Sequence, residues 1–453
     1  MSSVVADQNI YGAQFSALLD RLPGRGLVWL DRLRERAMDE FLELGFPTTR
    51  LESWKYTDVA PIRRIAFQPT ADYPIPALPE ALRLQVEAFP APRLVFINGK
   101  IDRKLSRRAP LALLSLSEAL ADPEQAKVVQ AHLGRYVSTA EHAFAAWNTA
   151  FFTDGAFILV PRGIAVEQPV NLVFVSLGTG KPWACFPRNL VIAREGSQVT
   201  FVETFIGPGL SAYLTNTVTE IIAEPGAMID YYKIESESAR SFHTATIQAH
   251  LDRDASLTSR SISFGGALVR NDLSVALDGE GSLCTLNGLF AAAGGQFVDN
   301  HTHVDHRKPH ASSRELYKGV LAGNAEGVFN GTITAQQHSK NLLLSEHAQI
   351  NTKPQFEIRA NDVRCVHGAT VGQIDEDAIF YLKSRGVGEG EARRILIRAF
   401  VAEILDDLRI PALRTLMERL FTGWVQSVTV GAVYEGVKKL TDTTEVPRMR
   451  IEN

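Results

Sequence analysis

The sequence predicts a mainly β protein in which a β-solenoid core lies between two α-helical regions. Three observations lead to this prediction. A turn signature recurs through the middle of the chain at nearly constant spacing, which is typical of stacked supersecondary units. Near both ends, apolar residues recur every three or four positions, as in amphipathic helices. Hydrophobic residues make up 45% of the 453 residues and charged residues 22%, which excludes disorder as the main state.

Residues 1–150 are predicted to form an N-terminal helical region with a proline-rich connector. Apolar side chains at helical spacing between positions 27 and 44 predict one amphipathic helix. Seven prolines between positions 61 and 92 favour an extended connector, because each proline fixes φ and lacks an amide donor. Residues 94–97, followed by an Asn-Gly pair, predict a short strand that enters a tight turn.

Residues 151–374 are predicted to form the solenoid core. Acidic and small residues lead into alternating strands around Gly196, Gly226, Asp254 and Gly281, at steps of 30, 28 and 27 residues. A β-sandwich also has turns at short intervals, but it gives no reason for one turn signature to recur at fixed spacing. The repeat therefore favours a solenoid over a sandwich.

Residues 375–453 are predicted to form a C-terminal helical region. Leu396, Phe400, Ile404 and Leu408 recur every four residues, and Pro411 then separates a second helical pattern from the first. Helices at both ends of the chain would also cover open strand edges, which otherwise invite aggregation.

Charge and cysteine content exclude several functional classes. The net charge of −4 gives no case for a nucleic acid or an anionic membrane as partner, and no apolar stretch is long enough to span a bilayer. Cys185, Cys284 and Cys365 are far apart and form no CxxC pair, so neither a zinc ribbon nor a disulfide framework is expected. Sparse cysteines and the absence of a recognisable signal peptide predict a cytoplasmic protein.

One cluster of histidines and aspartates could hold a divalent metal. Asp299, His301, His303 and Asp305 alternate along one predicted strand, and imidazole and carboxylate groups are common metal ligands. Period-two spacing places all four on one face and Val304 on the other, inward face. We therefore expect a solvated polar face rather than a metal site for His301 and His303.

A second candidate is the Cys365-Val-His367 motif. Spacing of two would place the thiol and the imidazole on the same side of a strand, where they could ligate iron or form a nucleophile–base pair. The alternative is that Cys365 is a small buried side chain and that His367 only satisfies nearby backbone groups.

Missing motifs narrow the chemistry further. The chain has no phosphate-binding G-x-x-x-x-G-K-[ST] loop, so nucleotide hydrolysis would have to come from a separate chain. Three dispersed cysteines do not supply the four thiolates that an iron–sulfur cluster usually takes. A cluster held here would therefore be shared with a partner.

Several further motifs carry a resemblance to a known family. They follow one another along nearly the whole chain: Pro47-Thr-Thr-Arg-Leu-Glu-Ser-Trp-Lys-Tyr-Thr57, Asn148-Thr-Ala-Phe-Phe-Thr-Asp-Gly155, Phe329-Asn-Gly331, Asn341-Leu-Leu-Leu344, Thr352-Lys-Pro-Gln355, Cys365-Val-His-Gly-Ala-Thr370 and Tyr381-Leu-Lys-Ser-Arg-Gly386. In these motifs the chain resembles the SufB/SufD family of the SUF system, which assembles iron–sulfur clusters.

The resemblance implies a right-handed parallel β-helix and an assembly or scaffold subunit, not an enzyme, that supports iron acquisition and de novo cluster assembly. It implies a heterodimer with SufB, and docking of the ATPase SufC on the C-terminal helices at Leu396, Phe400, Ile404 and Leu408. The isolated chain is also a candidate homodimer. No tightly bound cofactor is expected on the isolated chain, and iron or an iron–sulfur cluster is expected only transiently in the complex.

The resemblance also assigns residues. His367 matches a functional histidine near the SufB–SufD interface, so His367 and Cys365 form the predicted cluster-assembly site, with His367 as a transient iron ligand shared with SufB. Many SufB proteins carry Cys-Gly-Ala-His-Thr where this chain has Ala348-Gln-Ile-Asn-Thr352. The missing thiol favours a subunit of the SufD type.

Two other functions remain open from the sequence. A carbohydrate-active β-helix enzyme would need acidic residues along a groove, and no carboxylate position repeats beyond the turns. A metal enzyme centred on His301 and His303 would need both side chains to converge on one ion. Lyase assays and metal analysis would distinguish these functions from cluster assembly.

Overall fold

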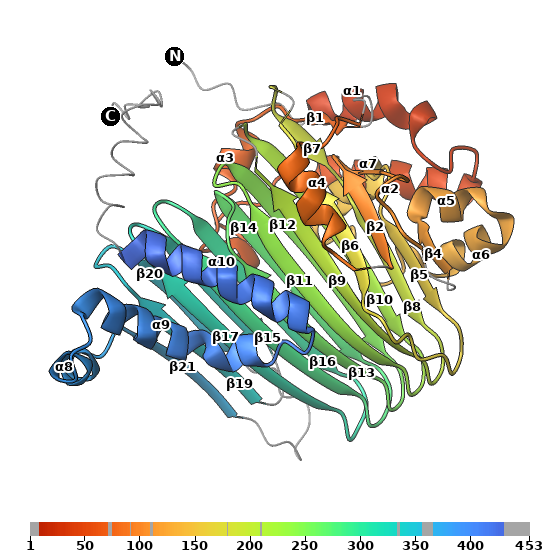
Figure 1. The fold of residues 1–453 in the computed structure, drawn as a ribbon. Helices are drawn as coiled ribbons and strands as arrows, with labels where there is room; N and C mark the ends of the chain where they lie inside the picture. The colour runs from red at the N-terminus through yellow and green to blue at the C-terminus, as the bar shows by residue number, and fades with distance from the viewer. Residues whose placement is uncertain are drawn as a thin grey trace.

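The computed structural model describes residues 9–70, 75–90, 92–108, 112–178, 180–208, 211–332, 336–355 and 366–429. Within these residues, two long β-sheets lie face to face, and helices cover the outer face of each sheet (Figure 1). The prediction of a mainly β solenoid between helical regions is confirmed.

The strands alternate between two sheets, and most of them pair in parallel with the strand two positions further along the chain. Each turn of the solenoid thus contributes one strand to each sheet. Sheet A contains β1 Gln68–Pro69, β4 Ala112–Ser115, β5 Ala156–Val160, β7 Trp183–Cys185, β8 Arg188–Ala193, β10 Tyr213–Ala223, β12 Ser241–Leu251, β14 Leu268–Leu277, β16 Phe297–His306, β18 Glu326–Thr332 and β20 Gln349–Gln355. Sheet B contains β2 Arg93–Ile97, β3 Lys100–Ile101, β6 Val170–Val175, β9 Gln198–Gly207, β11 Met228–Glu237, β13 Ser256–Ser263, β15 Leu283–Ala292, β17 Ser312–Leu321, β19 Gln336–Leu343 and β21 Val366–Gly372.

The repeated turn signature marks one corner of the solenoid. All four predicted turn positions have positive φ, between 57° and 72°, a conformation that glycine adopts at little cost. Backbone hydrogen bonds link successive turns, as from Gly196 N to Pro225 O at 2.9 Å. The same corner continues at Gly163 and His310, with φ of 70° and 60°, which the sequence repeat did not reveal.

The N-terminal helices cover the outer face of sheet A. They are α1 Asn9–Leu18, α2 Val28–Leu44, α3 Ala60–Arg63, α5 Leu116–Ala121, α6 Pro123–His132 and α7 Ala143–Phe151, with short 3₁₀ turns at Leu19–Arg21 and Glu52–Trp54. Trp147 of α7 centres an aromatic cluster, with its ring 4.7 Å from that of Tyr11 and 5.3 Å from that of Phe41. The proline-rich stretch is not extended throughout, because it contains α3 and also α4 Glu80–Glu87, which packs against sheet B.

The C-terminal helices cover the outer face of sheet B. They are α9 Glu389–Asp406 and α10 Pro411–Thr429, which Figure 1 shows in blue across the sheet, while α8 Glu376–Ser384 packs against α9. Apolar side chains of α9 and α10 share one core cluster with the outward side chains of sheet B. An ion pair of 2.7 Å between Arg260 and Asp407 also joins the two layers. In the described ranges, no helix combines the length and the apolarity needed to cross a lipid bilayer.

The two ends of the solenoid differ. At the N-terminal end, β3 pairs antiparallel with β2, and β4 pairs antiparallel with β5, so a short antiparallel strand is the last strand of each sheet. At the other end, β20 and β21 are the last strands of sheets A and B, and no further described strand pairs with them. We call the inner faces and free edges of β20 and β21 the open end.

Candidate functional site at the open end of the solenoid

His367 lies on β21, the last strand of sheet B. It is opposite Gln337 of β19 in the parallel register, so its side chain belongs to the inward-facing column of the solenoid. No later described strand covers this column, and His367 is exposed. The fold therefore presents the predicted imidazole at the mouth of the solenoid.

The column that ends at His367 changes from apolar to polar. Strand register aligns Leu286 of β15, Glu315 of β17, Gln337 of β19 and His367 of β21. Leu286 belongs to the apolar core, whereas the Gln337 side-chain amide donates to the Glu315 carboxylate at 2.7 Å. Burial raises the pKa of Glu315 to about 7. A titratable carboxyl and an amide thus lie directly behind the exposed imidazole.

The opposite wall of the open end comes from β20. Ile350, Thr352 and Pro354 align with Gly327, Phe329 and Gly331 of β18. Phe329 is fully buried in the core, so its neighbour Thr352 belongs to the inner face of β20. Ile350 and Pro354, two positions to either side of Thr352, lie on the same face. The free backbone edges of β20 and β21 can accept a strand from another chain.

The structure does not bring every predicted site residue together. Cys365 lies outside the described residues. The other two cysteines, Cys185 and Cys284, are buried, and burial raises the pKa of both thiols, that of Cys185 to about 12. Neither thiol is therefore poised to act as a thiolate.

The predicted SufC-docking residues are only partly available. Ile404 and Leu408 are buried against sheet B, with 1% and 2% exposure, so they stabilise this chain and do not form an outer surface. Leu396 and Phe400 are half-buried. The exposed aromatic residues nearby are Phe380 and Tyr381 of α8, with 73% and 58% exposure.

The interpretation of the Asp299–Asp305 stretch needs a correction. His303 is exposed as predicted, and Val304 points inward, but Asp299 is fully buried. The Asp299 carboxylate pairs with Arg270 at 2.5 Å and with His301 at 3.0 Å. Although burial opposes ionisation, Arg270 and His301 together hold the pKa of Asp299 below its usual range.

This buried pair is covered by the segment after α2. The Arg270 guanidinium lies 4.1 Å from the Trp54 ring and donates to the Ser53 carbonyl oxygen at 3.0 Å, and Thr57 donates to Asp299. The stretch therefore anchors the N-terminal region on sheet A. In the part of the chain that the structure describes, no three His, Cys, Asp or Glu side chains are placed to hold a metal ion.

Sequence reasoning missed a polar cluster inside the solenoid. Lys233 lies 2.9 Å from Nε2 of His243, whose Nδ1 is 2.6 Å from Glu237, and the Thr215 hydroxyl donates to Glu237 at 2.8 Å. All four side chains are buried. Burial raises the pKa of Glu237 and lowers that of His243, which keeps the imidazole neutral. No sequence signal marks these residues, because charged residues also alternate along ordinary solvent-facing strands.

Comparisons with known proteins identify the family. A model described as the SUF system FeS cluster assembly SufBD core domain matches residues 176–400, and one described as the SufBD protein N-terminal region matches residues 8–172. This chain belongs to the SufBD family. The family assignment gives no support to a carbohydrate-active enzyme or to a metal enzyme centred on His301 and His303.

Similar curated proteins carry matching names. An iron–sulfur cluster assembly SufBD family protein of Synechocystis sp. is 30% identical over 400 residues, covering 84% of this chain and 88% of that protein. The iron–sulfur cluster assembly protein SufD of Escherichia coli is 30% identical over 397 residues, covering 84% and 89%. The SufD of Bacillus subtilis is 27% identical over 422 residues, covering 85% and 92%. The resemblance predicted from sequence motifs is confirmed.

Proposed function

We propose that this chain is a non-hydrolytic subunit of the SufD type, which pairs with a SufB subunit through the open end and supports iron acquisition and cluster assembly there. The observation that carries the proposal is the exposed His367 at the end of a polar inward column, between two free strand edges. The names of the Escherichia coli and Bacillus subtilis relatives and the missing thiol in the 348–352 segment support the SufD type.

Pairing at the open end has a physical basis. A free strand edge carries unpaired backbone donors and acceptors, and natural proteins normally cover such edges. The inner face of β21 also exposes apolar surface, with Val371 48% exposed. A partner solenoid that stacked on this end would satisfy the edges and bury that surface.

Iron and the cluster are cargo in this proposal, not resident cofactors of the isolated chain. A neutral imidazole is a good ligand for ferrous iron, and a thiolate from SufB would complete the site across the interface. Cys365 precedes His367 by two positions and would add a transient sulfur contact. We place the assembly in the cytoplasm, where sparse cysteines stay reduced.

SufC docking is proposed on the exposed side of the C-terminal helices rather than on their buried side. Phe380 and Tyr381 of α8 supply exposed aromatic area next to α9, whereas Ile404 and Leu408 are committed to the core. Since aromatic anchors dominate many interfaces, these two side chains are the best points at which to test docking.

His367→Ala tests the cluster-assembly role. The variant should leave the SufB–SufC–SufD complex assembled and its melting temperature unchanged, yet abolish growth of a strain that depends on the SUF system. His303→Ala is the matched control, because His303 is also an exposed strand histidine. Full growth with His367→Ala, or loss of complex yield together with activity, would defeat the assignment.

Phe380→Ser combined with Tyr381→Ser tests SufC docking without removing helices that cover sheet B. Capture of SufC by the variant should fall at least about tenfold, since two interface aromatics each contribute roughly 1–2 kcal/mol or more. Capture of SufB should not change. Unchanged SufC capture would place the docking surface elsewhere.

A further inference from the structure

A densely basic loop lies at the closed, N-terminal end of the solenoid. Residues 98–108, which we call the basic loop, contain five cationic side chains and one aspartate, while the whole chain has a net charge of −4. The cationic residues are Lys100, Arg103, Lys104, Arg107 and Arg108. Nothing in the cluster-assembly role of the open end accounts for this concentration of charge.

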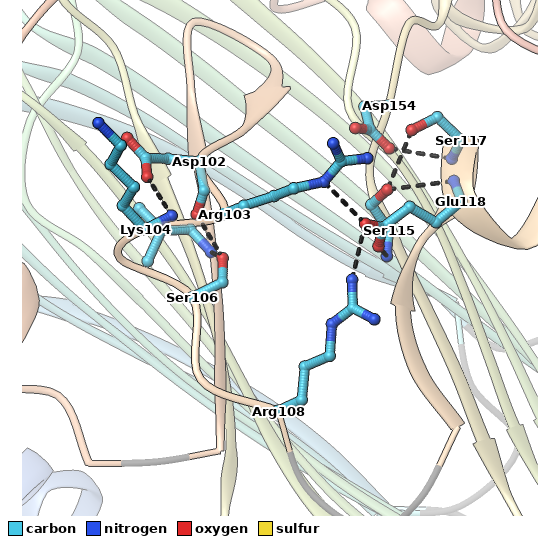
Figure 2. A network of polar contacts seen from close by, with 10 residues as sticks. Asp102, Arg103, Lys104, Ser106, Arg108, Ser115, Ser117, Glu118 and Asp154 are labelled. Carbon is cyan, nitrogen blue, oxygen red and sulfur yellow. Dashed lines mark hydrogen bonds and ion pairs between the residues drawn. The ribbon is translucent and has the colours of Figure 1, made fainter.

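The basic loop has a fixed shape. It starts in a tight turn, with φ of 49° at Asn98 and 78° at Gly99. Asp102 Oδ1 accepts the backbone N–H groups of Lys104 and Leu105 at 2.8 and 3.0 Å. The Ser106 hydroxyl donates to the Asp102 carbonyl oxygen at 2.7 Å. Figure 2 shows the hydrogen bonds of Asp102 with Lys104 and with Ser106. A partner would meet a preorganised loop and lose less entropy on binding.

Glu118 partly neutralises the two arginines at either side of the loop. One Glu118 oxygen accepts from both Arg103, at 3.1 Å, and Arg108, at 2.6 Å (Figure 2). The other Glu118 oxygen accepts the backbone N–H of Ser115 at 3.1 Å, in a helix cap. The Arg103 and Arg108 side chains remain 74% and 50% exposed. A single carboxylate therefore faces two exposed guanidinium groups.

The second nearby carboxylate is turned toward the backbone. Asp154 Oδ1 accepts the backbone N–H groups of Ser117 at 3.1 Å and Gly155 at 3.0 Å, as Figure 2 shows for Ser117. Asp154 is 4% exposed. These two bonds hold the Asp154 carboxyl against the backbone at the edge of the pocket that Lys100 and Arg103 also line.

A pocket of about 360 Å³ opens beside the loop. Its lining combines the cations Arg21, Lys100 and Arg103 with the apolar side chains of Pro23, Ile75 and Ile101, and it also includes Thr153 and the largely buried Asp154. Ile75 is 42% exposed. The pocket can therefore accept an apolar side chain whose neighbours in sequence are negatively charged.

We propose that the basic loop and this pocket dock an acidic segment of another protein, with one apolar side chain in the pocket and carboxylates on the loop. Exposed cations continue past the pocket to Lys104 and Arg107, which a small free anion would not reach. A nucleic acid would call for a basic chain and exposed aromatic platforms, whereas this chain has a net charge of −4 and the described residues that line the pocket include no aromatic side chain. The site adjoins β2 and β3, at the end of sheet B opposite to β21, so docking here leaves the open end free.

Fluorescence anisotropy on the full chain tests the proposal. The probe is a fluorescein-labelled, Glu-rich peptide with one central Leu, titrated at low and at physiological salt. Lys104→Gln combined with Arg107→Gln should weaken binding by roughly five- to tenfold, because rim charges each contribute a few-fold. Arg162→Gln combined with Arg253→Gln is the matched control, since these arginines are 76% and 68% exposed at the solenoid turns. The control should bind as the wild type does.

A separate variant tests the apolar contact between Ile75 of the pocket and the Leu of the peptide. Ile75→Ser should weaken binding of the Leu-containing peptide by about threefold but should not affect a peptide with Ser in place of Leu. Circular dichroism checks that each variant is folded. Equal weakening by both charge variants, or equal binding of a peptide with Gln in place of Glu, would overturn the site. Tighter binding of single-stranded DNA or of phosphatidylserine vesicles through Lys104 and Arg107 would overturn the acidic protein as occupant.

Discussion

The two ends of the solenoid differ in how the last strand of each sheet is paired and covered. At the N-terminal end, the short antiparallel strands β3 and β4 are the last strands of the sheets, and helices with a large aromatic cluster cover sheet A. At the C-terminal end, β20 and β21 are the last strands among the described residues, and most residues of β21 are exposed. The described chain thus ends each sheet with a short antiparallel strand at one end and with a parallel strand at the other, where β21 lies largely exposed.

The difference indicates which end meets another solenoid. Free strand edges aggregate unless something covers them, so an edge that the chain itself does not cover is expected to be covered by a partner. The closed end depends on buried contacts for stability, whereas the open end exposes polar and apolar groups that gain little within this chain. Substitutions at the closed end should therefore lower the stability of the chain, whereas substitutions at the open end should mainly affect binding of a partner.

The largest effect is expected in the aromatic cluster of the N-terminal helices, which packs on the outer face of sheet A. Trp147→Ala removes a side chain that contacts Tyr11, Phe41 and Phe186, and should lower the free energy of unfolding by about 3–5 kcal/mol. Val371→Ala at the open end should cost less than about 1 kcal/mol, because Val371 is already half exposed. Chemical denaturation of both variants measures the contrast. Equal costs would refute the difference between the ends.

A buried ion pair between β8 and β10 of sheet A, to which the N-terminal region hydrogen-bonds, should show the next largest effect. Arg188 and Glu220 pair at 2.5 Å with both side chains fully buried, and Glu220 also accepts the Gly134 N–H at 2.9 Å. Glu220→Ala leaves Arg188 buried without its carboxylate and should cost about 3 kcal/mol. Lys353→Gln, which breaks the exposed pair with Glu52 near the open end, should leave the denaturation midpoint unchanged.

The buried carboxyl behind His367 predicts a pH dependence. Burial raises the folded-state pKa of Glu315 to about 7, above its value in the unfolded chain, so the folded state holds the proton more tightly. The wild type therefore loses stability as pH rises through this range, and Glu315→Gln avoids that loss. Relative to the wild type, the variant should gain roughly 2 kcal/mol between pH 5 and pH 8. A constant difference across pH would contradict the assignment.

The smallest effect separates the two histidines of β16. His301→Ala removes a partner of the buried Asp299 carboxylate and should cost about 1 kcal/mol. His303→Ala should stay within about 0.5 kcal/mol, because His303 is exposed. Thermal denaturation of the two single variants distinguishes them, and the reverse order would show that Asp299 does not depend on His301.

The sequence predicted the solenoid because its turns carry a local signal. Positive φ at one corner selects Gly, Asp or another tolerant residue, and that choice repeats at each turn. His367 was predictable from the family motif, and its place at the end of an inward column follows from strand register. The free edges that surround it depend on where the pairing of strands stops, which local patterns do not reveal.

The α9 prediction shows where periodicity misleads. Leu396, Phe400, Ile404 and Leu408 are four residues apart, so each step advances about 40° beyond a full helical turn. The first two lie at the edge of the buried stripe, and Ile397 and Val401 occupy its centre instead. Asp299 was misplaced for a related reason, because alternation along a strand does not tell whether its outer face meets water or another segment.

The most direct test of the account is hydrogen exchange on the chain alone and in complex with a SufB subunit. If the open end is the pairing surface, amides of β20 (residues 349–355) and β21 (residues 366–372) should exchange rapidly in the monomer and become protected in the complex. Amides of β2, β3 and β4 at the closed end should not change. Protection at the closed end, with β20 and β21 unaffected, would contradict the proposal that the open end is the pairing surface.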